Sequence, residues 1–556
     1  MKRLVIPYGI SDYKELRLSG MYYIDKTPYI EHLERKPRYL FLVRPRRFGK
    51  SLLVSMLEAY YDRRHEAEFD QLFGDTYIHR QPTAERNSYY VLRLDFSAVD
   101  SREADASFNA YCNEQFELFL RQYGMALDLP YENCTLNLVV LLNHLKLHHL
   151  SLFVLIDEYD NFINDLLARD EAEYRRLVTG QEAIYKQFFR NLKAGTSGTD
   201  APVKRMFITG VSPVALFDVT SGYNIGAHIT TDSDFNDFLG VTREELDVMI
   251  EHYGLEGQRE EIFARMDEWY DGYRFSEEAE HTIFNTDMAL YYLLALIEKG
   301  KEPKELIDLN VRSDYGKIRF LVQTDRRLNG NFSMLAELLA TGRAETLALA
   351  DSFSAFELRQ RENFISLLFY LGLISIEKKE QGLLHLCIPN QTIRKIVGEF
   401  LQKALKENEL LDLKLERFNL LLRELAWFRK LDVFRYLAEQ LELHSKLRDY
   451  ISGESFIKGF LAAYLSLNSL YELSTEKEAG KGFVDLYLHP ISAEVPYGAA
   501  LELKYIKRNE LTAALLEQKT QEALAQLQRY TLPDNTVKVA LVFHGWELIR
   551  VEEGSS

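Results

Sequence analysis

Cysteine and long apolar runs are scarce in this sequence of 556 residues, and positive charge is not in excess. The 3 Cys residues fit neither a zinc-binding spacing nor a disulfide framework, which predicts buried thiols in a reducing compartment. Apolar runs such as 152–156 and 539–543 fall far short of the ~20 residues that cross a bilayer, and the first residues lack the apolar core of a signal peptide. We therefore expect a cytoplasmic protein that does not associate with membranes.

The charge balance gives no general basic character. The formal net charge is −17, from 84 Asp and Glu against 67 Lys and Arg. A nucleic-acid-binding protein usually shows a basic surface, although a local basic cleft can exist on an acidic molecule. With 47% hydrophobic and 27% charged residues, the composition is that of a folded protein, and the length predicts several domains.

The pattern of apolar residues divides the chain into three predicted domains. Residues 1–275 alternate short buried strands with helices, which predicts an α/β domain with a parallel sheet covered by helices on both faces. The predicted strands are 39–43, 89–96, 152–156 and 205–209.

The middle block, 276–445, is mostly helical, and its elements at 361–404 occur in the order helix, hairpin, helix of a winged-helix unit. Because no cluster of Arg or Lys marks the second helix, we favour a structural, lid-like role for this unit. The last block, 446–556, returns to mixed α/β structure, with a final strand predicted at 537–543.

A phosphate-binding loop is predicted after the first strand. Gly49-Lys50-Ser51 follows the buried strand and opens a helix, which is the setting of a P-loop. Gly49 would let backbone N–H groups approach phosphate, Lys50 would bind the β and γ phosphates, and Ser51 would hold Mg²⁺. The other loop residues expected to contact ATP are Arg46, Arg47, Phe48 and Leu52. The alternative is a basic surface turn with solvated arginines.

Two acids end the buried strand at 152–156. Asp157 is suited to the Mg²⁺ shell and Glu158 to polarising the attacking water, because acids at the carboxyl end of a buried parallel strand emerge where such sheets bind ligands. A simple acidic turn is the alternative. On the next strand, Thr209 or Ser212 could sense the γ-phosphate, and a capping or turn role is an equal alternative.

These stretches resemble the AAA-ATPase-like family found in bacteria, which is often fused to a PD-(D/E)XK nuclease domain. The resemblance covers roughly residues 1–275 and implies ATP binding. Arg44 stands at the position of the usual first glycine of a P-loop, and the resemblance implies that this form of the loop is usual in the family. It also implies that Arg274 could be a phosphate-sensing arginine. The segments that carry it are 6–13, 23–27, 44–51, 94–97, 208–213 and 269–275.

Three charged residues mark a predicted hairpin near the C-terminus. Glu502 and Lys504 are two apart and share one strand face, next to a strand that carries Asp485. Asp485, Glu502 and the Leu503 carbonyl would bind Mg²⁺, and Lys504 would orient or deprotonate the attacking water. The alternative is an exposed hairpin with an ordinary mixture of charges.

The surroundings of these residues resemble the PD-(D/E)XK domain, which has a restriction-endonuclease-like α/β fold. The resemblance covers roughly 446–556, through the segment 478–485 and the Gln-x-x-x-Tyr element at 526–530. It implies that Glu454 completes the metal shell. Phe483 stands where that family often has Arg.

The favoured hypothesis is an ATP-hydrolysing protein with a Mg²⁺-dependent nuclease domain that acts on DNA, with RNA as the other candidate substrate, in defence or repair. One alternative is a nucleotide-controlled switch or scaffold whose C-terminal domain binds nucleic acid or a partner without cutting. Another is a nuclease whose P-loop is a relic. A homo-oligomer is compatible with each hypothesis.

Overall fold

A computed structural model describes residues 4–554 apart from 170, 181–182, 215–225, 312–322, 325–326, 329, 359, 408–413, 444–452, 467, 469 and 481. The chain forms two compact units. One contains Met1–Lys317 and Thr346–Leu384, and the other contains Ile318–Glu345 and His385–Ser556. Residues of the predicted middle block enter both units, and the predicted boundary at 445/446 lies outside the described residues.

The first unit is built on a five-stranded parallel sheet with the strand order β2-β3-β4-β1-β5. The four predicted strands are present, and β5 is an additional short one. All six residues of β3 are buried, as expected for a strand covered on both faces. The strands are β1 (Tyr39–Val43), β2 (Tyr90–Asp95), β3 (Leu152–Asp157), β4 (Val203–Gly210) and β5 (Ala227–His228).

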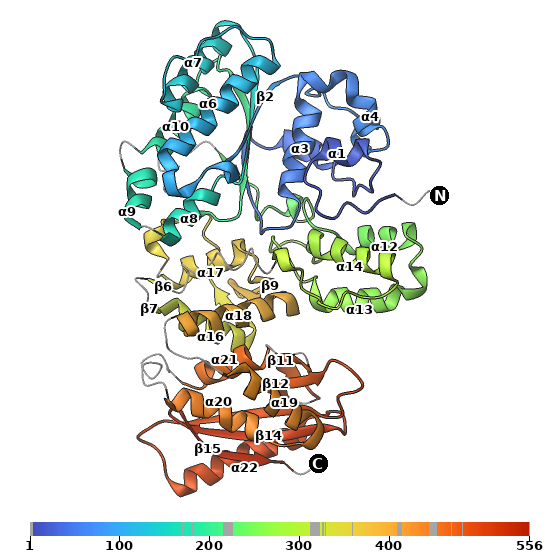
Figure 1. Ribbon diagram of the computed structural model, residues 1–556, viewed down its shortest axis with the longest axis vertical. Coiled ribbons are helices and arrows are strands. Elements are labelled where there is room, and N and C mark those ends of the chain that lie inside the picture. Colours follow the sequence, from blue (N-terminus) through green and yellow to red (C-terminus); the bar gives the residue numbers. More distant parts are fainter. Residues whose placement is uncertain are drawn as a thin grey trace. The chain divides into compact units, whose positions relative to one another are not determined.

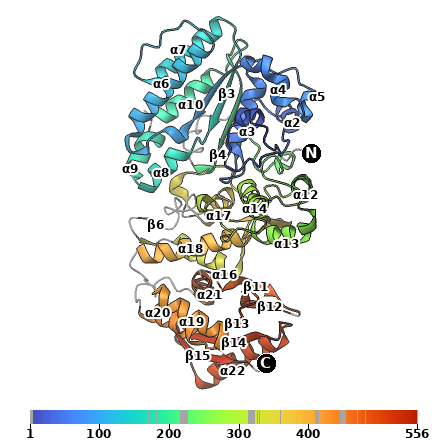
Figure 2. The same cartoon turned by 45° about the vertical axis from the view of Figure 1, so that its right-hand side comes forward.

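Helices cover both faces of this sheet, as the sequence predicts. In both ribbon views, one group lies on one side of the strands and α3 lies with the N-terminal helices on the other (Figure 1, Figure 2). The first group is α6 (Ala104–Gln122), α7 (Cys134–Leu147) and α10 (Ile184–Ala194), and the second is α1 (Tyr13–Leu18), α3 (Lys50–Tyr61) and α4 (Phe69–Phe73).

Further helices complete the first unit. They include α12 (Arg243–His252), α13 (Arg259–Trp269), α14 (Thr286–Lys299) and α17 (Arg361–Tyr370). A capping box at Thr242 and Glu245 starts α12, and the Asn285 side chain accepts a hydrogen bond from Met288 N–H at the start of α14.

The predicted order of helix, hairpin and helix is confirmed in the middle of the chain. Helix α17 is followed by β9 (Ser375–Glu380), β10 (Leu383–Cys387) and α18 (Gln391–Glu407). The division between the two units falls within β10, so this segment is not a separate domain.

The second unit contains a five-stranded mixed sheet with the order β11-β12-β13-β14-β15. Only β13 and β14 run parallel, and the other neighbouring pairs are antiparallel. Its strands are β11 (Tyr471–Glu478), β12 (Phe483–Pro490), β13 (Gly498–Ile506), β14 (Thr536–His544) and β15 (Glu547–Glu553). The strand predicted at 537–543 is confirmed as β14, but it is not the final one, because a turn at Gly545, with φ 60°, returns the chain as β15.

Helices pack against this sheet. Helix α22 (Ala513–Arg529) lies against β13 and β14, and α21 (Glu454–Leu465) contacts β11, β12 and β13. Between α22 and the sheet, Ala523 and Leu527 are buried with Ala500 and Ala540 in one apolar cluster. Two helices from the predicted middle block, α19 (Leu415–Phe428) and α20 (Asp432–Leu443), belong to this unit. Within the described ranges, no helix is both long and apolar enough to span a membrane.

Candidate active sites

The loop between β1 and α3 has the backbone conformation of a phosphate-binding turn. Gly49 caps α3 in the left-handed region with φ 93°, and Arg47 also has a positive φ of 70°. A Cβ on Gly49 would meet no atom within 4 Å, so the dihedral angle rather than space favours glycine here. The first turn of α3 therefore presents free backbone N–H groups and the positive end of the helix dipole.

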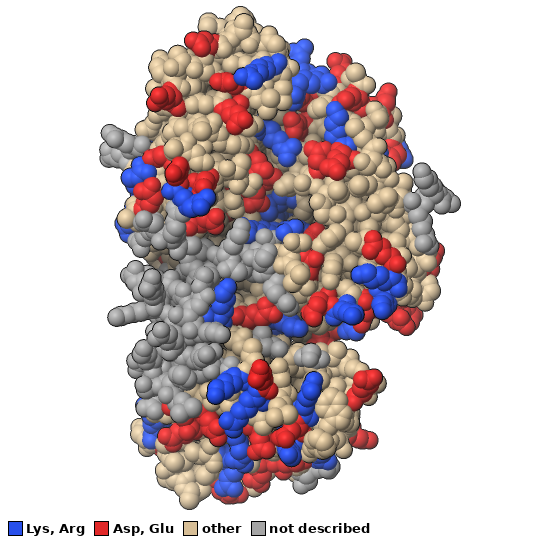
Figure 3. Space-filling model, in the orientation of Figure 1, with Lys and Arg blue, Asp and Glu red and all other residues tan. Residues whose placement is uncertain are grey.

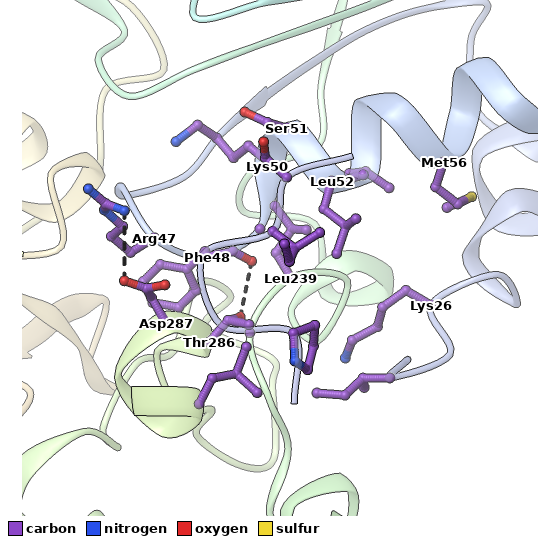
Figure 4. A pocket seen from close by; sticks show the side chains of 18 of the residues that line it. Lys26, Arg47, Phe48, Lys50, Ser51, Leu52, Met56, Leu239, Thr286 and Asp287 are labelled. Atoms are coloured by element: carbon purple, nitrogen blue, oxygen red, sulfur yellow. Dashed lines mark hydrogen bonds and ion pairs between the residues drawn. The ribbon is translucent and has the colours of Figure 1, made fainter. Parts of the chain in front are cut away.

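A cavity of about 500 Å³ opens beside this loop (Figure 4). Its volume lies in the range of small-molecule sites. Residues 46–53 line one side, and Lys26, Leu239 and Thr286 are among those that face them. The remaining lining includes an apolar group formed by Ile10, Leu16, Ile24, Met56 and Leu290. A cavity lined by both a charged loop and apolar side chains suits a nucleotide, which carries phosphates at one end and an aromatic base at the other.

Lys50 and Glu158 meet at this cavity. The Lys50 side chain is only 4% exposed, and its Nζ lies 3.4 Å from Glu158 Oε1 and 3.3 Å from the Pro45 carbonyl oxygen. Glu158 has a φ of 50°, an unusual conformation for a residue with a side chain, at the end of β3. Both residues line the cavity, so the structure brings this predicted pair together.

Asp157 is fully buried beside Ser51. Burial and the neighbouring Glu158 raise the pKa of Asp157 to about 6, while a hydrogen bond from Ser51 opposes the shift. Asp157 Oδ1 accepts the Glu158 N–H at 3.0 Å, and Oδ2 accepts no well-aligned hydrogen bond from the described residues. A buried carboxylate oxygen without a full set of partners, next to a serine hydroxyl, fits a site for a hard cation.

The structure does not bring the predicted phosphate sensors Thr209, Ser212 and Arg274 to the cavity lined by the described residues. Thr209 lies at the end of β4 with a buried hydroxyl that has no hydrogen-bond partner among the described residues. Arg274 donates from Nη1 to the Glu377 carbonyl oxygen at 3.0 Å, and its N–H donates to Ser375 Oγ at 2.7 Å. None of these residues lines the cavity within the described part of the chain.

Arg44 and Phe48 have structural roles in the loop. The Arg44 guanidinium is fully buried, donates to the carbonyl oxygens of Thr230 and Phe235, and lies 4.0 Å from the Phe275 ring centre. Phe48 is 1% exposed and packs edge-on against the Phe275 ring. A solvated basic turn is therefore wrong for Arg44, because backbone carbonyls and an aromatic ring replace its water.

The start of α14 forms hydrogen bonds to the loop between β1 and α3. The sequence did not predict these contacts. Thr286 Oγ1 donates to the Phe48 carbonyl oxygen at 3.2 Å, and Asp287 N–H donates to the Arg47 carbonyl oxygen at 3.1 Å. Arg47 Nη1 also lies 3.8 Å from Asp287 Oδ2 (Figure 4). The capping residue Asn285 was the available local signal, but it could not reveal which loop the helix start would contact.

The second cluster of predicted residues lies on the sheet of the other unit. Asp485 on β12 is 7% exposed, and its Oδ2 accepts the Leu503 N–H at 2.7 Å. The N–H and C=O of a strand residue point to the same edge, so the Leu503 carbonyl also faces β12. Glu502 is 1% exposed, and its Oε1 lies 3.4 Å from the Asp485 backbone nitrogen.

Glu502 is held by two further groups. Tyr530 Oη lies 2.7 Å from Glu502 Oε1, and Lys504 Nζ lies 3.3 Å from Oε2. Burial and the nearby Asp485 raise the pKa of Glu502 well above its usual value, and the contacts to Tyr530 and Lys504 oppose the shift. The predicted set of Asp485, Glu502 and Lys504 is thus assembled, and an ordinary exposed hairpin is excluded by this burial.

A lysine that the sequence analysis did not identify occupies the centre of the acids. Lys458 Nζ lies 2.5 Å from Asp485 Oδ1, 3.2 Å from Glu454 Oε1 and 3.7 Å from Glu476 Oε1. The spacing of Glu454 and Lys458, four residues apart on α21, was a signal for a helix ion pair. It did not show that the pair would face β12.

The oxygen atoms of this cluster are chemically suited to a hard divalent cation. In the structure, however, the carboxylates of Asp485, Glu454 and Glu476 contact the Lys458 ammonium. Two buried carboxylates and a backbone carbonyl are oxygen ligands of the kind that Mg²⁺ uses. Across the described ranges, no group of three or more His, Cys, Asp or Glu side chains is arranged to hold a metal ion. A physical reason for this absence is that the Lys458 ammonium already contacts Asp485 Oδ1.

The surface shows no extended basic region on the face drawn in Figure 3. Among the described residues of that face, Lys and Arg side chains are interspersed with Asp and Glu (Figure 3). Blue side chains are also seen inside the hollow in the upper part of the view.

Comparisons with known proteins match one family in each half of the chain. Residues 7–220 match the family model described as a predicted AAA-ATPase, and residues 452–553 match the PD-(D/E)XK nuclease superfamily. A curated relative from Azotobacter chroococcum mcd 1, described as an uncharacterized protein in the vnfD 5' region, is 29% identical over 288 residues. That match covers 51% of this chain and 51% of the relative, so the chain matches about half the relative's length.

Solved structures similar to the chain include the ORC2 protein of Aeropyrum pernix in its ADPNP–ADP complexes, with 14% identity and a TM-score of 0.32. That match covers 73% of this chain and 98% of ORC2. Cdc6p from Pyrobaculum aerophilum has 13% identity and a TM-score of 0.26, over 70% of this chain and 98% of Cdc6p. By its family matches, this chain joins a predicted AAA-ATPase domain at residues 7–220 to a PD-(D/E)XK nuclease superfamily domain at residues 452–553.

Proposed function

We propose that this protein binds and hydrolyses ATP and that its C-terminal domain cleaves DNA in a Mg²⁺-dependent reaction. The observation that carries the ATPase assignment is the buried contact between Lys50 and Glu158 at a cavity of about 500 Å³. The two family matches support the combination of activities in one chain.

The ATPase residues have separate tasks in this proposal. The Lys50 ammonium binds the β and γ phosphate oxygens, together with the N–H groups that follow Gly49. Ser51 and Asp157 would hold Mg²⁺, which neutralises charge on the phosphates when it is bound. The Glu158 carboxylate, at the end of β3, accepts a hydrogen bond from the attacking water and orients it. Lys50 Nζ lies 3.4 Å from Oε1 of this carboxylate.

The nuclease residues are assigned in the same way. Asp485, Glu502 and the Leu503 carbonyl would hold Mg²⁺, which polarises the phosphodiester when bound. Lys504, which contacts Glu502 at 3.3 Å, orients the water that attacks phosphorus. Tyr530 contacts Glu502 from the other side and fixes its rotamer, so it is a positioning residue.

The test measures cleavage of linear, circular and single-stranded DNA, and of RNA, with Mg²⁺ or Mn²⁺, in the presence and absence of ATP. The parent protein is compared with Asp485→Asn and Lys50→Ala, and ATP hydrolysis is measured alongside. Cleavage that Asp485→Asn abolishes and Lys50→Ala alters is expected. Cleavage that persists in Asp485→Asn contradicts the nuclease assignment, and unchanged ATP affinity in Lys50→Ala contradicts the P-loop assignment.

A second candidate function is a nucleotide-controlled switch whose C-terminal domain binds nucleic acid or a partner without cutting it. The ion pair of Lys458 with Asp485 favours this candidate, because it neutralises a residue that a nuclease needs free. Binding of nucleic acid that survives in the parent, with ATP hydrolysis intact and no cleavage under any metal condition, is the outcome that distinguishes it.

A further inference from the structure

Lys458 has an unusual environment for a lysine on a helix. Its side chain is 13% exposed, and its ammonium contacts carboxylates from three different elements, α21, β11 and β12. The shortest contact, 2.5 Å, is to Asp485 Oδ1. A surface lysine would normally be solvated and paired weakly, if at all. The burial of this one and its three partners indicate a defined position.

The strand register explains why a cation is needed at this point. Strands β11 and β12 keep the same antiparallel register on both sides of one gap, with Thr475 facing Leu486 before it and Lys477 facing Val484 after it. Glu476 and Asp485 are therefore opposite one another, and this is the one position of the register where no pair forms between Tyr471 and Glu478.

Two like charges opposite each other on adjacent strands destabilise a sheet. Glu476 also has a positive φ of 49°, an unfavourable conformation for a residue with a Cβ, at the interruption of the ladder. Lys458 Nζ contacts both carboxylates. The local sheet therefore depends on a positive charge between these strands.

Each oxygen of the Asp485 carboxylate already has one partner in this arrangement. Oδ1 contacts the Lys458 ammonium at 2.5 Å and Oδ2 accepts the Leu503 N–H at 2.7 Å. A divalent cation binds a carboxylate oxygen at roughly 2.0–2.6 Å. An ammonium and a dication cannot share one oxygen at such distances, because they would repel each other strongly at close range.

We propose that Lys458 is the resident counter-cation of the nuclease site and that it must release Asp485 before a divalent cation can bind. This inference rests on the proposed nuclease function and adds its control. Glu454 and Glu476 then receive the displaced ammonium and are not first ligands of the metal. Their side chains are 36% and 35% exposed, compared with 10% for Asp485, so they can follow the lysine toward solvent.

Lysine is suited to this exchange. Its ammonium sits on a flexible four-carbon stem, so it can move between carboxylates without a change in the backbone. The consequence is that the site stays assembled and neutralised without metal, and it binds metal more weakly than an open carboxylate pair would. Cleavage is thereby restricted to conditions in which the free metal concentration is sufficient to displace Lys458.

The test measures Mn²⁺ binding to the full chain without nucleotide, from the electron paramagnetic resonance signal of free Mn²⁺. The parent is compared with Lys458→Met, which keeps the apolar stem and removes the charge, and with Lys458→Arg, which keeps the charge and grips carboxylates in two places. The Mn²⁺ binding that is lost in Asp485→Asn is assigned to this site. We expect Mn²⁺ affinity to rise by about tenfold or more in Lys458→Met and to fall in Lys458→Arg.

A lysine with only a structural role would not produce this order. Thermal unfolding shows whether Lys458→Met folds. If it does not, the Mn²⁺ affinity of Lys458→Arg is compared with that of the parent. Mn²⁺ binding by Lys458→Arg that is equal to or tighter than binding by the parent overturns the proposal. Asp485-dependent binding that is not tightened in a folded Lys458→Met variant also overturns it and leaves the nuclease assignment intact. Absence of Asp485-dependent binding in every variant overturns both.

Discussion

Asp157 gives the most direct test of how the ATPase site is built, because its burial should make the nucleotide-free protein less stable. Its pKa is raised from 3.8 to about 6 by burial and by Glu158. The folded state therefore keeps a proton that the unfolded chain loses, and stability falls as pH rises from 3.8 to 6. Above pH 6 the full penalty, roughly 3 kcal/mol of unfolding free energy, is present.

Asp157→Asn removes the charge and keeps an oxygen that can accept the Glu158 N–H. We expect the nucleotide-free variant to be more stable than the parent by roughly 3 kcal/mol at pH 8 and by about half of that at pH 5. Urea unfolding of both proteins at the two pH values measures this difference. Addition of Mg²⁺ and ATP should stabilise the parent, because a ligand of the folded state raises its stability, but not the variant.

Asp160→Asn is a matched control from the same strand end. Burial also raises the pKa of Asp160 to about 6, but its two oxygens accept N–H groups from Val211 at 3.1 Å and Ser212 at 2.6 Å. An amide cannot accept at both positions, so an N–H left without an acceptor, at about 1–3 kcal/mol, should offset the gain from removing the charge and make Asp160→Asn less stable than Asp157→Asn at pH 8. An Asp157→Asn variant that is less stable than the parent at pH 8, or a difference that does not change with pH, would refute the reasoning.

Three further outcomes follow from the described contacts. Tyr530→Phe removes the hydroxyl 2.7 Å from Glu502 Oε1 and should weaken Mn²⁺ binding at the nuclease site by about tenfold, as measured by titration. Arg44→Met leaves buried carbonyl oxygens without donors and should lower the thermal unfolding temperature, while the variant that remains folded keeps its ATP affinity in equilibrium binding. Gly210→Ala places a Cβ 2.3 Å from a buried carboxylate oxygen and should cost several kcal/mol in urea unfolding, whereas Gly257→Ala, with no atom within 4 Å, should cost less than about 1 kcal/mol.

The sheet of the first unit was predictable because its strands are continuous apolar runs. A strand such as β3, which is buried at every position, can be predicted from its own sequence without knowledge of its neighbouring strands. Strand β11 is different: its burial alternates along much of Tyr471–Glu478, and all of its 8 residues except Tyr471 and Leu473 are Glu, Lys, Ser or Thr. The edge strand β15 is only partly buried and carries charge, so its sequence 547–553 has little apolar pattern. Both were missed for the same reason, which is that they are stabilised by pairing with a neighbour more than by burial.

Site residues were predictable where chemistry and spacing are local. Gly49, Lys50 and Ser51 are consecutive, and a helix start explains their roles. Thr209 and Arg274 were placed by their position at strand ends or in a motif, and a one-dimensional pattern cannot tell where a side chain turns afterwards. The contact of Lys458 with Glu476 and Asp485 joins segments far apart in the chain, and it depends on the register of two strands that a sequence does not specify.

The two sites share one physical solution to the same problem. Each gathers carboxylates in a place with little water, where isolated negative charges are costly. In each, a lysine supplies a neighbouring positive charge: Lys50 Nζ lies 3.4 Å from Glu158 Oε1, and Lys458 Nζ lies 2.5 Å from Asp485 Oδ1. A ligand that brings its own cation can take over this neutralisation and free the lysine. In the ATPase site the freed ammonium gains phosphate oxygens, which favours binding, whereas in the nuclease site it gains only more exposed carboxylates. The same device should therefore assist nucleotide binding at the first site and oppose metal binding at the second.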